Sequence, residues 1–361
     1  MAKKILVVDD SALIRRVLSD IINSDKRFEV VDRAADGEQA LQLLKRNTYD
    51  AVVLDVNMPK MGGIQLLNEL RKNNIKAKVM MASTDTTEGA KVTLDALEMG
   101  ALDFVHKPQN VAGCKSEEFK QDMLRVLSVV TESAPPVFES YEQMRANKKV
   151  VRKVVDIVKK HPVHISGSSI VAIAISTGGP KTLQSLVPQL PANLNAPVLI
   201  VQHMPKGFTA TLAQRLNQIS EISVKEAEEG EILQKGHVYI ARAGSHMKVK
   251  KLAAGKNAIT YSDEPTREGV RPCANYMYES LMECNYDNNI CVVMTGMGAD
   301  GTEGIKHLKE RKSVYVISQD QASSIVYGMP KSIANAGLSD QVVPLPQIAQ
   351  EIILHVGLAL N

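Results

Sequence analysis

Residues 4–10 read KILVVDD, and this stretch decides the fold of the first part of the chain. A short aliphatic and β-branched run ends abruptly in Asp9 and Asp10, as a buried strand does where it reaches a polar sheet edge. Residues 11–23 follow at once with apolar side chains at helical spacing. A fully apolar strand that leads directly into an amphipathic helix indicates a parallel sheet covered by helices.

The alternation of strand and helix continues to about residue 131. Its later strands are as apolar as the first, so both faces of the sheet should be covered. We therefore predict an α/β domain with a doubly wound parallel sheet over residues 1–131. Further strands are expected at 28–31, 51–56, 78–83 and 103–106, and further helices at 37–47, 63–72, 88–99 and 117–131.

The pattern breaks over residues 132–168, which are rich in proline and end in a Gly-Ser group. We interpret this segment as a linker between two domains. Within it, VVRKVVDIVKK at 150–160 has helical periodicity with basic residues on its outer face. A short helix on a domain surface is favoured over a contact with an acidic partner, because such charge runs are usually solvated.

Strand and helix alternate again over residues 169–361, which predicts a second doubly wound α/β domain. Residues 224–265 differ, because HVYIA, MKVKKL and NAITYS have strand composition and are separated by glycine turns. We expect this region to form a β-hairpin insertion. The strands of the main sheet are expected at 170–176, 197–203, 290–296 and 314–318.

Bulk composition excludes several classes of protein. The formal net charge is only +3, and no basic stripe or reading helix indicates binding to nucleic acid. Four cysteines without CxxC spacing make a zinc site improbable and fit a reducing compartment. The apolar run after the N-terminal lysines is too short for a signal peptide, and no run is long enough to insert into a membrane. We expect a cytoplasmic protein.

Three carboxylates are expected at one edge of the first sheet. Asp9 and Asp10 follow the first strand and Asp55 lies near the end of the third. Clustered carboxylates repel one another and need a hard cation such as Mg²⁺. Ser83 ends the fourth strand and Lys107 follows the fifth, as a transient acyl phosphate would require. Each residue alone could be a turn former or helix cap, but the joint set makes chance improbable.

A serine, a histidine and an aspartate follow three strands of the second domain. Ser176 lies in IAISTGGP, where glycines permit a sharp turn into a helix. His203 ends the next strand, and Asp300 lies in TGMGADG after strand 290–296. Together they favour a triad in which Ser176 attacks, His203 takes its proton and Asp300 orients the imidazole. His246, in the expected hairpin, is the competing base.

Simpler interpretations exist for each of these motifs. Ser176 or Thr177 could merely cap the helix, and the glycine-rich loops could hold a phosphate. No GxGxxG or Walker lysine supports a nucleotide site, however. The chain could also be a non-enzymatic adaptor with a degenerate hydrolase domain. A missing triad member would favour that interpretation, but all three members are present.

Residues 1 to about 130 resemble the response-regulator receiver domain, and the two halves together resemble the chemotaxis protein-glutamate methylesterase family, CheB. STGGP, VQHMP, TGMGADG and the segment at 319–337 carry the second resemblance. It implies a flavodoxin-like receiver over 1–131 and a Rossmann-like esterase domain over 169–361. It also implies phosphorylation by a chemotaxis histidine kinase, and methyl-accepting chemoreceptors as the substrate.

The resemblance assigns roles to individual residues. In the esterase domain, which needs no cofactor, it implies catalysis by Ser176, His203 and Asp300, an oxyanion donor at the N–H of Met297, and support of the histidine by Thr177. In the receiver it implies the phospho-acceptor Asp55, Mg²⁺ ligands at Asp9, Asp10, Asp55 and the Asn57 carbonyl, a phosphoryl contact at Lys107, and switch positions at Ser83 and Phe104.

The reaction implied is hydrolysis of glutamyl γ-methyl esters, with deamidation of particular glutamines as a second activity. We expect the receiver to restrain the esterase until Asp55 is phosphorylated. Two short segments depart from the family pattern. Ala174-Ile175 stands where Gly-Ala is usual, and Cys273-Ala274-Asn275 stands where Ser-Val-Asp is usual. These departures bear on substrate fit and rate more than on chemistry.

Overall fold

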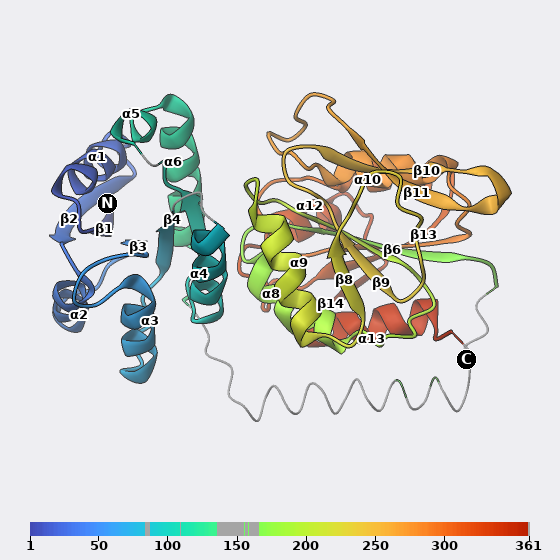
Figure 1. The fold of residues 1–361 in the computed structure, drawn as a ribbon, viewed down its shortest axis with the longest axis horizontal. Helices are drawn as coiled ribbons and strands as arrows, with labels where there is room; N and C mark the ends of the chain where they lie inside the picture. The colour runs from blue at the N-terminus through green and yellow to red at the C-terminus, as the bar shows by residue number, and fades with distance from the viewer. Residues whose placement is uncertain (84–86, 109, 136–154, 156–157, 159–165, 360–361) are drawn as a thin grey trace. The chain divides into compact units, whose positions relative to one another are not determined.

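A computed structural model describes residues 1–83, 87–108, 110–135, 155, 158 and 166–359 (Figure 1). The chain divides into two compact units, 1–139 and 140–361, each of which is described by itself. The expected linker at 132–168 and its helix at 150–160 lie almost entirely outside the described residues. The linker boundaries therefore stay predictions.

The first unit is built on a parallel five-stranded sheet in the order β2-β1-β3-β4-β5. This confirms the predicted doubly wound α/β fold, and all five residues of β3 are buried, as a central parallel strand requires. The strands are β1 (Lys3–Val8), β2 (Phe28–Ala34), β3 (Ala51–Asp55), β4 (Val79–Ser83) and β5 (Asp103–His106).

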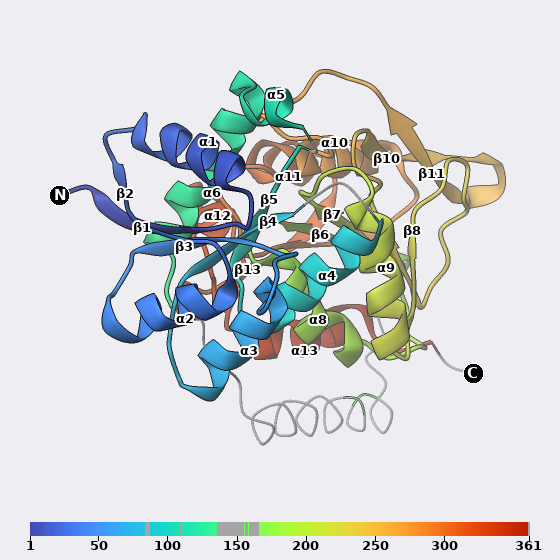
Figure 2. The same ribbon diagram turned by 60° about the vertical axis from the view of Figure 1, so that its left-hand side comes forward.

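Helices cover both faces of this sheet. Figure 2 shows α1 on one side of the strands and α2 and α3 on the other. Short polar residues begin several of them, and Ser11, Asp36 and Ser116 each accept a backbone N–H at the helix start. The helices are α1 (Ala12–Asn23), α2 (Gly37–Arg46), α3 (Gly63–Lys72), α4 (Thr87–Glu98), α5 (Val111–Cys114) and α6 (Glu117–Glu132).

The second unit contains a parallel seven-stranded sheet in the order β14-β13-β12-β6-β7-β9-β8. Its central strands β6, β12 and β7 carry the residues expected to be catalytic just beyond their carboxyl ends. The strands are β6 (Ser169–Ile175), β7 (Val198–Gln202), β8 (Ser223–Glu226), β9 (His237–Ile240), β12 (Asn288–Val293), β13 (Ser313–Gln319) and β14 (Gln341–Val343).

The helices of the second unit pack around this sheet. Helix α10 (Ala274–Ser280) lies beside strand β10 (His246–Lys251) in both ribbon views (Figures 1 and 2). The helices are α8 (Gly179–Leu186), α9 (Phe208–Ile219), α10 (Ala274–Ser280), α11 (Thr302–Lys309), α12 (Met329–Asn335) and α13 (Leu345–Val356), with 3₁₀ turns at Val187–Gln189, Ala253–Gly255 and Leu281–Glu283.

The expectation for residues 224–265 was correct only in part. Strands β10 (His246–Lys251) and β11 (Asn257–Ser262) form an antiparallel hairpin, as predicted. HVYI, however, is not part of a hairpin, because it forms β9 and pairs in parallel with β7 and β8. Three of its four residues are buried, which marks a sheet interior. The short strand β14 was also missed.

The helices of the second unit and of the first share one further property. Within the part of the chain that the structure describes, no helix combines the length and the apolar character needed to cross a bilayer.

Candidate active site and phosphorylation site

The first sheet gathers three carboxylates at its carboxyl edge, as the sequence predicts. Asp9 follows β1, Asp10 is next to it, and Asp55 ends β3. Oxygens from the three side chains lie within 4.8 Å of one another. Asp9 and Asp55 are buried whereas Asp10 is exposed. The cluster is therefore closed on the protein side and open toward solvent.

Lys107 supplies one positive charge to this cluster. Its Nζ lies 2.8 Å from Asp55 Oδ1 and 3.0 Å from Asp9 Oδ2. Burial raises the pKa of Asp55, although Lys107 acts in the opposite direction. Burial alone would lower the pKa of Lys107, but the two carboxylates outweigh it and hold that pKa above its ordinary value. One ammonium facing three carboxylates leaves an excess of negative charge.

The donor set fits a hard divalent cation. All three side chains offer carboxylate oxygens, which Mg²⁺ prefers, and the net negative charge favours a cation over a neutral ligand. Asn57, whose carbonyl was expected to complete the set, is exposed two residues beyond the end of β3. The structure thus brings the expected ligands to one edge of the sheet.

The two residues expected to act as a switch lie on neighbouring strands of the same sheet. Ser83 ends β4, and its Oγ lies 2.6 Å from Thr93 Oγ1 and 3.3 Å from the carbonyl oxygen of Gly89, both in α4. Phe104 is buried on β5. In this structure the Ser83 hydroxyl is engaged by α4, so it would have to leave Thr93 in order to bind a phosphoryl oxygen. Thr93 was not identified from the sequence.

In the second sheet, Ser176 lies in the turn between β6 and α8. Its N–H donates to the Thr295 carbonyl at 3.0 Å, and its carbonyl accepts from Gly179 N at 2.7 Å. Gly178 has φ +74°, a conformation that L side chains rarely adopt, so this turn needs glycine. Ser176 is 9% exposed, and its hydroxyl makes no hydrogen bond to any residue of 166–359. That hydroxyl is held in place by its backbone and remains free to react.

His203 and Asp300 form a buried pair. His203 Nε2 lies 2.8 Å from Asp300 Oδ2. Its other ring nitrogen, Nδ1, has no hydrogen-bond partner among the described residues, so it is the nitrogen that could take a proton. Ser176 and His203 directly follow a register pair of the adjacent strands β6 and β7, Ile175 and Gln202. No Ser176–His203 hydrogen bond is formed in the described structure, and such bonds often tighten only when substrate binds.

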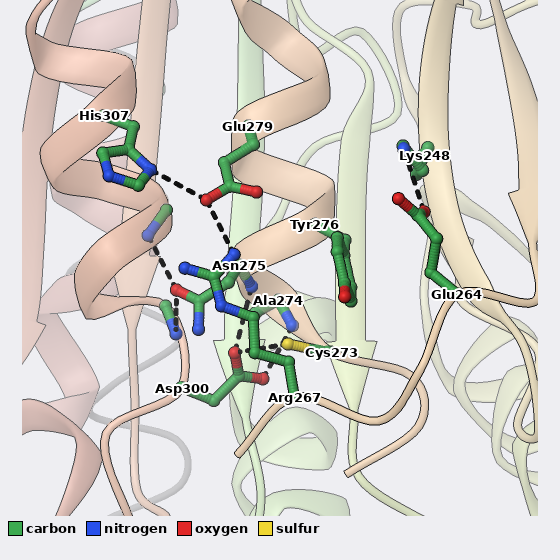
Figure 3. A network of polar contacts seen from close by, with 12 residues as sticks. Lys248, Glu264, Arg267, Cys273, Ala274, Asn275, Tyr276, Glu279, Asp300 and His307 are labelled. Carbon is green, nitrogen blue, oxygen red and sulfur yellow. Dashed lines mark hydrogen bonds and ion pairs between the residues drawn. The ribbon is translucent and has the colours of Figure 1, made fainter. Parts of the chain in front are cut away.

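Asp300 is the most thoroughly bound side chain of the site. Besides His203, it accepts from the N–H groups of Ala274 at 2.6 Å and Asn275 at 3.0 Å, and from the thiol of Cys273 at 3.0 Å. Burial opposes its charge, but His203 and these donors outweigh burial and hold the pKa of Asp300 below its ordinary value. Figure 3 shows its carboxylate facing the start of α10. Asp300 therefore stays ionised.

The departing segment Cys273-Ala274-Asn275 thus contacts the expected catalytic carboxylate directly. The Asn275 side-chain oxygen also accepts from Gly301 N at 3.1 Å and Gly304 N at 2.7 Å, which ties α10 to the start of α11. Further along α10, Glu279 binds Arg267 at 2.7 Å and His307 at 2.8 Å (Figure 3). The helix that donates to Asp300 is therefore fixed from two sides.

His246 is unsuited to act as the base. Its Nδ1 accepts the N–H of Cys273 at 3.2 Å, so its proton must lie on Nε2, which donates to the Glu264 carbonyl at 3.1 Å. Burial, assisted by the charge of Arg271, lowers the pKa of His246. Both ring nitrogens are occupied by backbone, and the residue instead holds Cys273 next to Asp300.

Gln202 connects the two halves of the site and was not identified from the sequence. Its Nε2 donates to the carbonyls of Ser176 and His203, both at 3.0 Å. A Cβ at Gly179 would come 1.9 Å from Gln202 Oε1, so this arrangement requires glycine there. The only sequence signal was a polar residue ending an otherwise apolar strand, VLIVQ.

Two backbone N–H groups near Ser176 are unpaired. Within the described residues, neither Met297 N nor Thr177 N donates to a protein acceptor. The loop that carries Met297 lies against the serine, because a Cβ at Gly296 would be 2.7 Å from Ser176 Cβ. Such N–H groups can stabilise an oxyanion. Met297 was expected in this role from the sequence, whereas Thr177 was expected only to cap the helix or to support the histidine.

The segment at 319–337 holds this loop. Gly296 N donates to the Val326 carbonyl at 3.0 Å, and Met329 N donates to the Gly296 carbonyl at 2.8 Å. The Thr295 side chain accepts from Val326 N at 2.9 Å. Ile175, the departure before the serine, is fully buried in β6 and therefore repacks the strand rather than lining an open site.

Comparisons with known proteins agree with both halves of the chain. The family model described as CheB methylesterase matches residues 171–352, and that of the response regulator receiver domain matches residues 5–115. A protein-glutamate methylesterase/protein-glutamine glutaminase from Pyrococcus abyssi is 41% identical over 353 residues, covering 98% of this chain and 93% of its own. A protein of the same name from Geobacillus kaustophilus is 38% identical over 354 residues, covering 98% and 99%.

A solved structure matches the second unit. The catalytic domain of the Thermotoga maritima CheB methylesterase aligns with a TM-score of 0.50 at 41% sequence identity, covering 52% of this chain and 98% of that one. The matched structure agrees with a parallel-sheet α/β fold for the part of the chain that contains Ser176, His203 and Asp300.

Proposed function

The chain belongs to the CheB methylesterase family with an N-terminal response regulator receiver domain, and from this premise we propose that it hydrolyses glutamyl γ-methyl esters on the cytoplasmic helices of chemoreceptors. The reaction uses a triad of Ser176, His203 and Asp300. Phosphorylation of Asp55 by a chemotaxis histidine kinase in the cytoplasm activates it. The observation that carries the proposal is the hydrogen-bonded His203–Asp300 pair. Its members follow β7 and β12, the two strands on either side of β6, and β6 leads into Ser176, whose hydroxyl has no partner in residues 166–359.

The hydrolysis proceeds through an acyl enzyme. Ser176 Oγ attacks the ester carbonyl and transfers its proton to His203 Nδ1, while Asp300 stabilises the imidazolium. The N–H groups of Met297 and Thr177 stabilise the oxyanion. His203 then gives the proton to the departing methoxide, which leaves as methanol. Water, deprotonated by His203, releases the glutamate and restores the serine. With a glutamine as substrate, the same steps release ammonia.

The receiver supplies the control. Asp55 accepts the phosphoryl group beside Lys107, and Asp9, Asp10, Asp55 and the Asn57 carbonyl would hold Mg²⁺, which neutralises phosphoryl oxygens. Ser83 exchanges Thr93 for a phosphoryl oxygen, and Phe104 repacks behind it. These contacts exist only in the phosphorylated state, so they can shift the equilibrium away from a restrained form of the enzyme.

Methanol release tests this proposal directly. The purified full chain is incubated with a methyl-labelled chemoreceptor fragment, with and without acetyl phosphate and Mg²⁺. We expect labelled methanol, more of it with the phosphodonor, and none above background from Ser176→Ala. Asp55→Asn should retain basal release and lose the response to the phosphodonor. Binding of the receptor fragment without methanol release by the wild-type chain would instead favour a non-enzymatic adaptor.

A further inference from the structure

A cavity of about 430 Å³ lies in the second unit, at the same sheet edge as the triad. Lys206 enters it from the segment after β7, three residues beyond His203. Arg242 and Ser245 enter it from the segment between β9 and β10, and Glu226 from the end of β8. The volume is in the range of sites that bind small groups. The cavity is not used by the hydrolytic steps described above.

Two cations in this cavity have no counter-ion. Lys206 and Arg242 are exposed, and no carboxylate of the described residues lies within ion-pair distance of either. Of the two acidic residues that line the cavity, Glu226 accepts the Thr209 hydroxyl at 2.6 Å and Asp263 is exposed on the segment after β11. The cations are therefore available to an incoming anion.

Arg242 is also held in a suitable orientation. Its guanidinium carbon lies over the Tyr261 ring, 4.5 Å from the ring centre. Burial raises the pKa of Tyr261 to about 12, and its hydroxyl donates to the Ala227 carbonyl, so the ring is a fixed neutral platform. A guanidinium held over an aromatic ring by cation–π attraction can still offer N–H groups to a carboxylate.

Ser245 adds a neutral hydrogen-bonding group to the cavity. It lines the cavity and is only 7% exposed, and its hydroxyl has no hydrogen-bond partner in residues 166–359. A hydroxyl that no protein group engages can donate to a ligand oxygen. A ligand oxygen in the cavity would satisfy this hydroxyl together with the two cations.

We propose that this cavity, here called the Lys206–Arg242 cavity, binds an acidic side chain of the substrate helix next to the ester that is hydrolysed. The inference rests on the proposed function, because it deepens the recognition of the same substrate. It makes Lys206 and Arg242 specificity residues that read a carboxylate. Neither takes part in the chemistry at Ser176.

Sheet geometry fixes how far that carboxylate lies from the ester. Ile175 pairs with Gln202 across β6 and β7, and Ile200 pairs with Ile240 across β7 and β9, so Arg242 is level with the strand ends that carry Ser176 and His203. Two strand spacings separate β6 from β9, about 10 Å. Seven residues of an α-helix rise about 10.5 Å and return to the same face. The acidic residue should therefore lie seven positions from the ester.

Three helical peptides test the inference. Each carries a central glutamate γ-methyl ester, and they differ only in the residues seven positions to either side, which are glutamate, glutamine or lysine. At low ionic strength the wild-type full chain should hydrolyse the glutamate peptide about 3–10-fold more efficiently than the glutamine peptide, the range expected of surface charge pairs. The lysine peptide should be the poorest substrate.

The double variant Lys206→Gln/Arg242→Gln should lose this preference and hydrolyse all three peptides with similar kcat/KM. Because both residues are exposed, the variant should fold normally. Lys306→Gln, which removes an exposed lysine of α11, is the matched control and should keep the wild-type preference. If the peptides are hydrolysed too slowly to compare, fluorescence anisotropy of the three peptides with Ser176→Ala gives the same ranking as affinities.

The outcomes separate this inference from the function on which it rests. A wild-type chain that releases no methanol from methyl-labelled receptor refutes the proposed function. Hydrolysis of receptor without a preference among the peptides refutes only the Lys206–Arg242 cavity as an acidic subsite. A preference that survives in the double variant, or a preference for the lysine peptide, refutes it equally.

Discussion

The two carboxylates at the centres of the two sites, Asp55 and Asp300, are both buried at the carboxyl edge of a parallel sheet, yet their surroundings are opposite. Asp55 shares the ammonium of Lys107 with Asp9, Asp10 lies in the same cluster, and burial raises the pKa of Asp55. Asp300 receives four donors, and its pKa lies below the ordinary value in spite of burial. Burial alone does not determine the charge of a carboxylate; the number of donors does.

This difference matches the role that the proposed function gives to each carboxylate. As a phospho-acceptor, Asp55 would need room for a phosphoryl group and a cation, which agrees with its few protein donors. As the triad carboxylate, Asp300 would need to hold a ring in one orientation and stay ionised, which agrees with its four donors. The first site depends on what binds it, whereas the second is complete without any ligand. The following predictions test that contrast, beginning with the largest effect.

Histidine substitutions should separate the base from its support. His203→Gln removes the nitrogen that takes the Ser176 proton, and we expect methanol release to fall on the order of thousands-fold. His246→Gln should lower it only about tenfold, because a lost hydrogen bond to Cys273 disturbs Asp300 indirectly. Rates are compared with methyl-labelled receptor at several pH values. A larger loss for His246→Gln than for His203→Gln would show that the base has been assigned to the wrong residue.

Removal of divalent metal should affect only the receiver site. With EDTA the response to acetyl phosphate should disappear while basal methanol release is unchanged, since the proposed function uses a cation only at Asp9, Asp10 and Asp55, the group of side chains within the described residues that could hold one. If one charge-assisted hydrogen bond drives activation, the phosphodonor should raise the rate of methanol release about tenfold, and EDTA should abolish that increase. Asp55→Asn serves as the control, because EDTA should not change its rate further. A fall in basal release with EDTA would place a metal in the esterase mechanism.

The layout of both sheets follows from sequence patterns because parallel strands are buried on both faces and leave continuous apolar runs. Asp9, Asp55 and Lys107 converge in the structure as expected, since Asp55 ends such a strand and the other two directly follow one. HVYI was assigned to a hairpin because glycine turns surround it, and a short apolar run does not reveal its partner strand. Strand β14 has only three residues and gives almost no periodic signal.

Parts of the esterase site could not be predicted because their partners are distant in sequence. Cys273 contacts both His246 and Asp300, and each of these partners lies 27 positions away from it in the sequence. Gln202 donates to the backbone carbonyls of Ser176 and His203, and the pattern of side chains in the sequence does not indicate such contacts. Motifs can name reactive residues, but the groups that hold them depend on tertiary packing.

Substitution of Cys273 should test how many donors Asp300 needs. Cys273→Ala removes the thiol but keeps the N–H groups of Ala274 and Asn275, so kcat should fall about fivefold, as the loss of roughly one hydrogen bond implies. Cys273→Ser restores a donor of similar size and should recover the wild-type rate. KM should change in neither variant, because the residue does not contact the substrate. Equal kcat values for Cys273→Ala and the wild type would show that the backbone donors suffice.

The smallest effect concerns stability and pH. Burial, with the charge of Arg271, lowers the pKa of His246, so the folded chain keeps this ring neutral where the unfolded chain protonates it. The stability tied to the neutral ring is complete above a pH of about 6.5, the usual pKa of histidine, and falls as the pH drops toward the lowered folded value. His355, whose pKa burial also lowers, acts in the same direction. The carboxylate of Asp300 titrates below this window.

His246→Gln should therefore unfold about 1 kcal/mol more easily at pH 7.5, because it has lost a backbone contact. Between pH 7.5 and pH 5.5 it should then lose less stability than the wild type does. Urea titration with pulsed hydrogen exchange, measured on peptides from residues 237–262, gives both quantities for the second unit within the full chain. His355→Gln should flatten the pH dependence on its own, and the double variant should flatten it further. If His246→Gln retained the full wild-type pH dependence, the ring would not be neutral in the folded chain, and its hydrogen bond from the Cys273 N–H could not be what holds that residue beside Asp300.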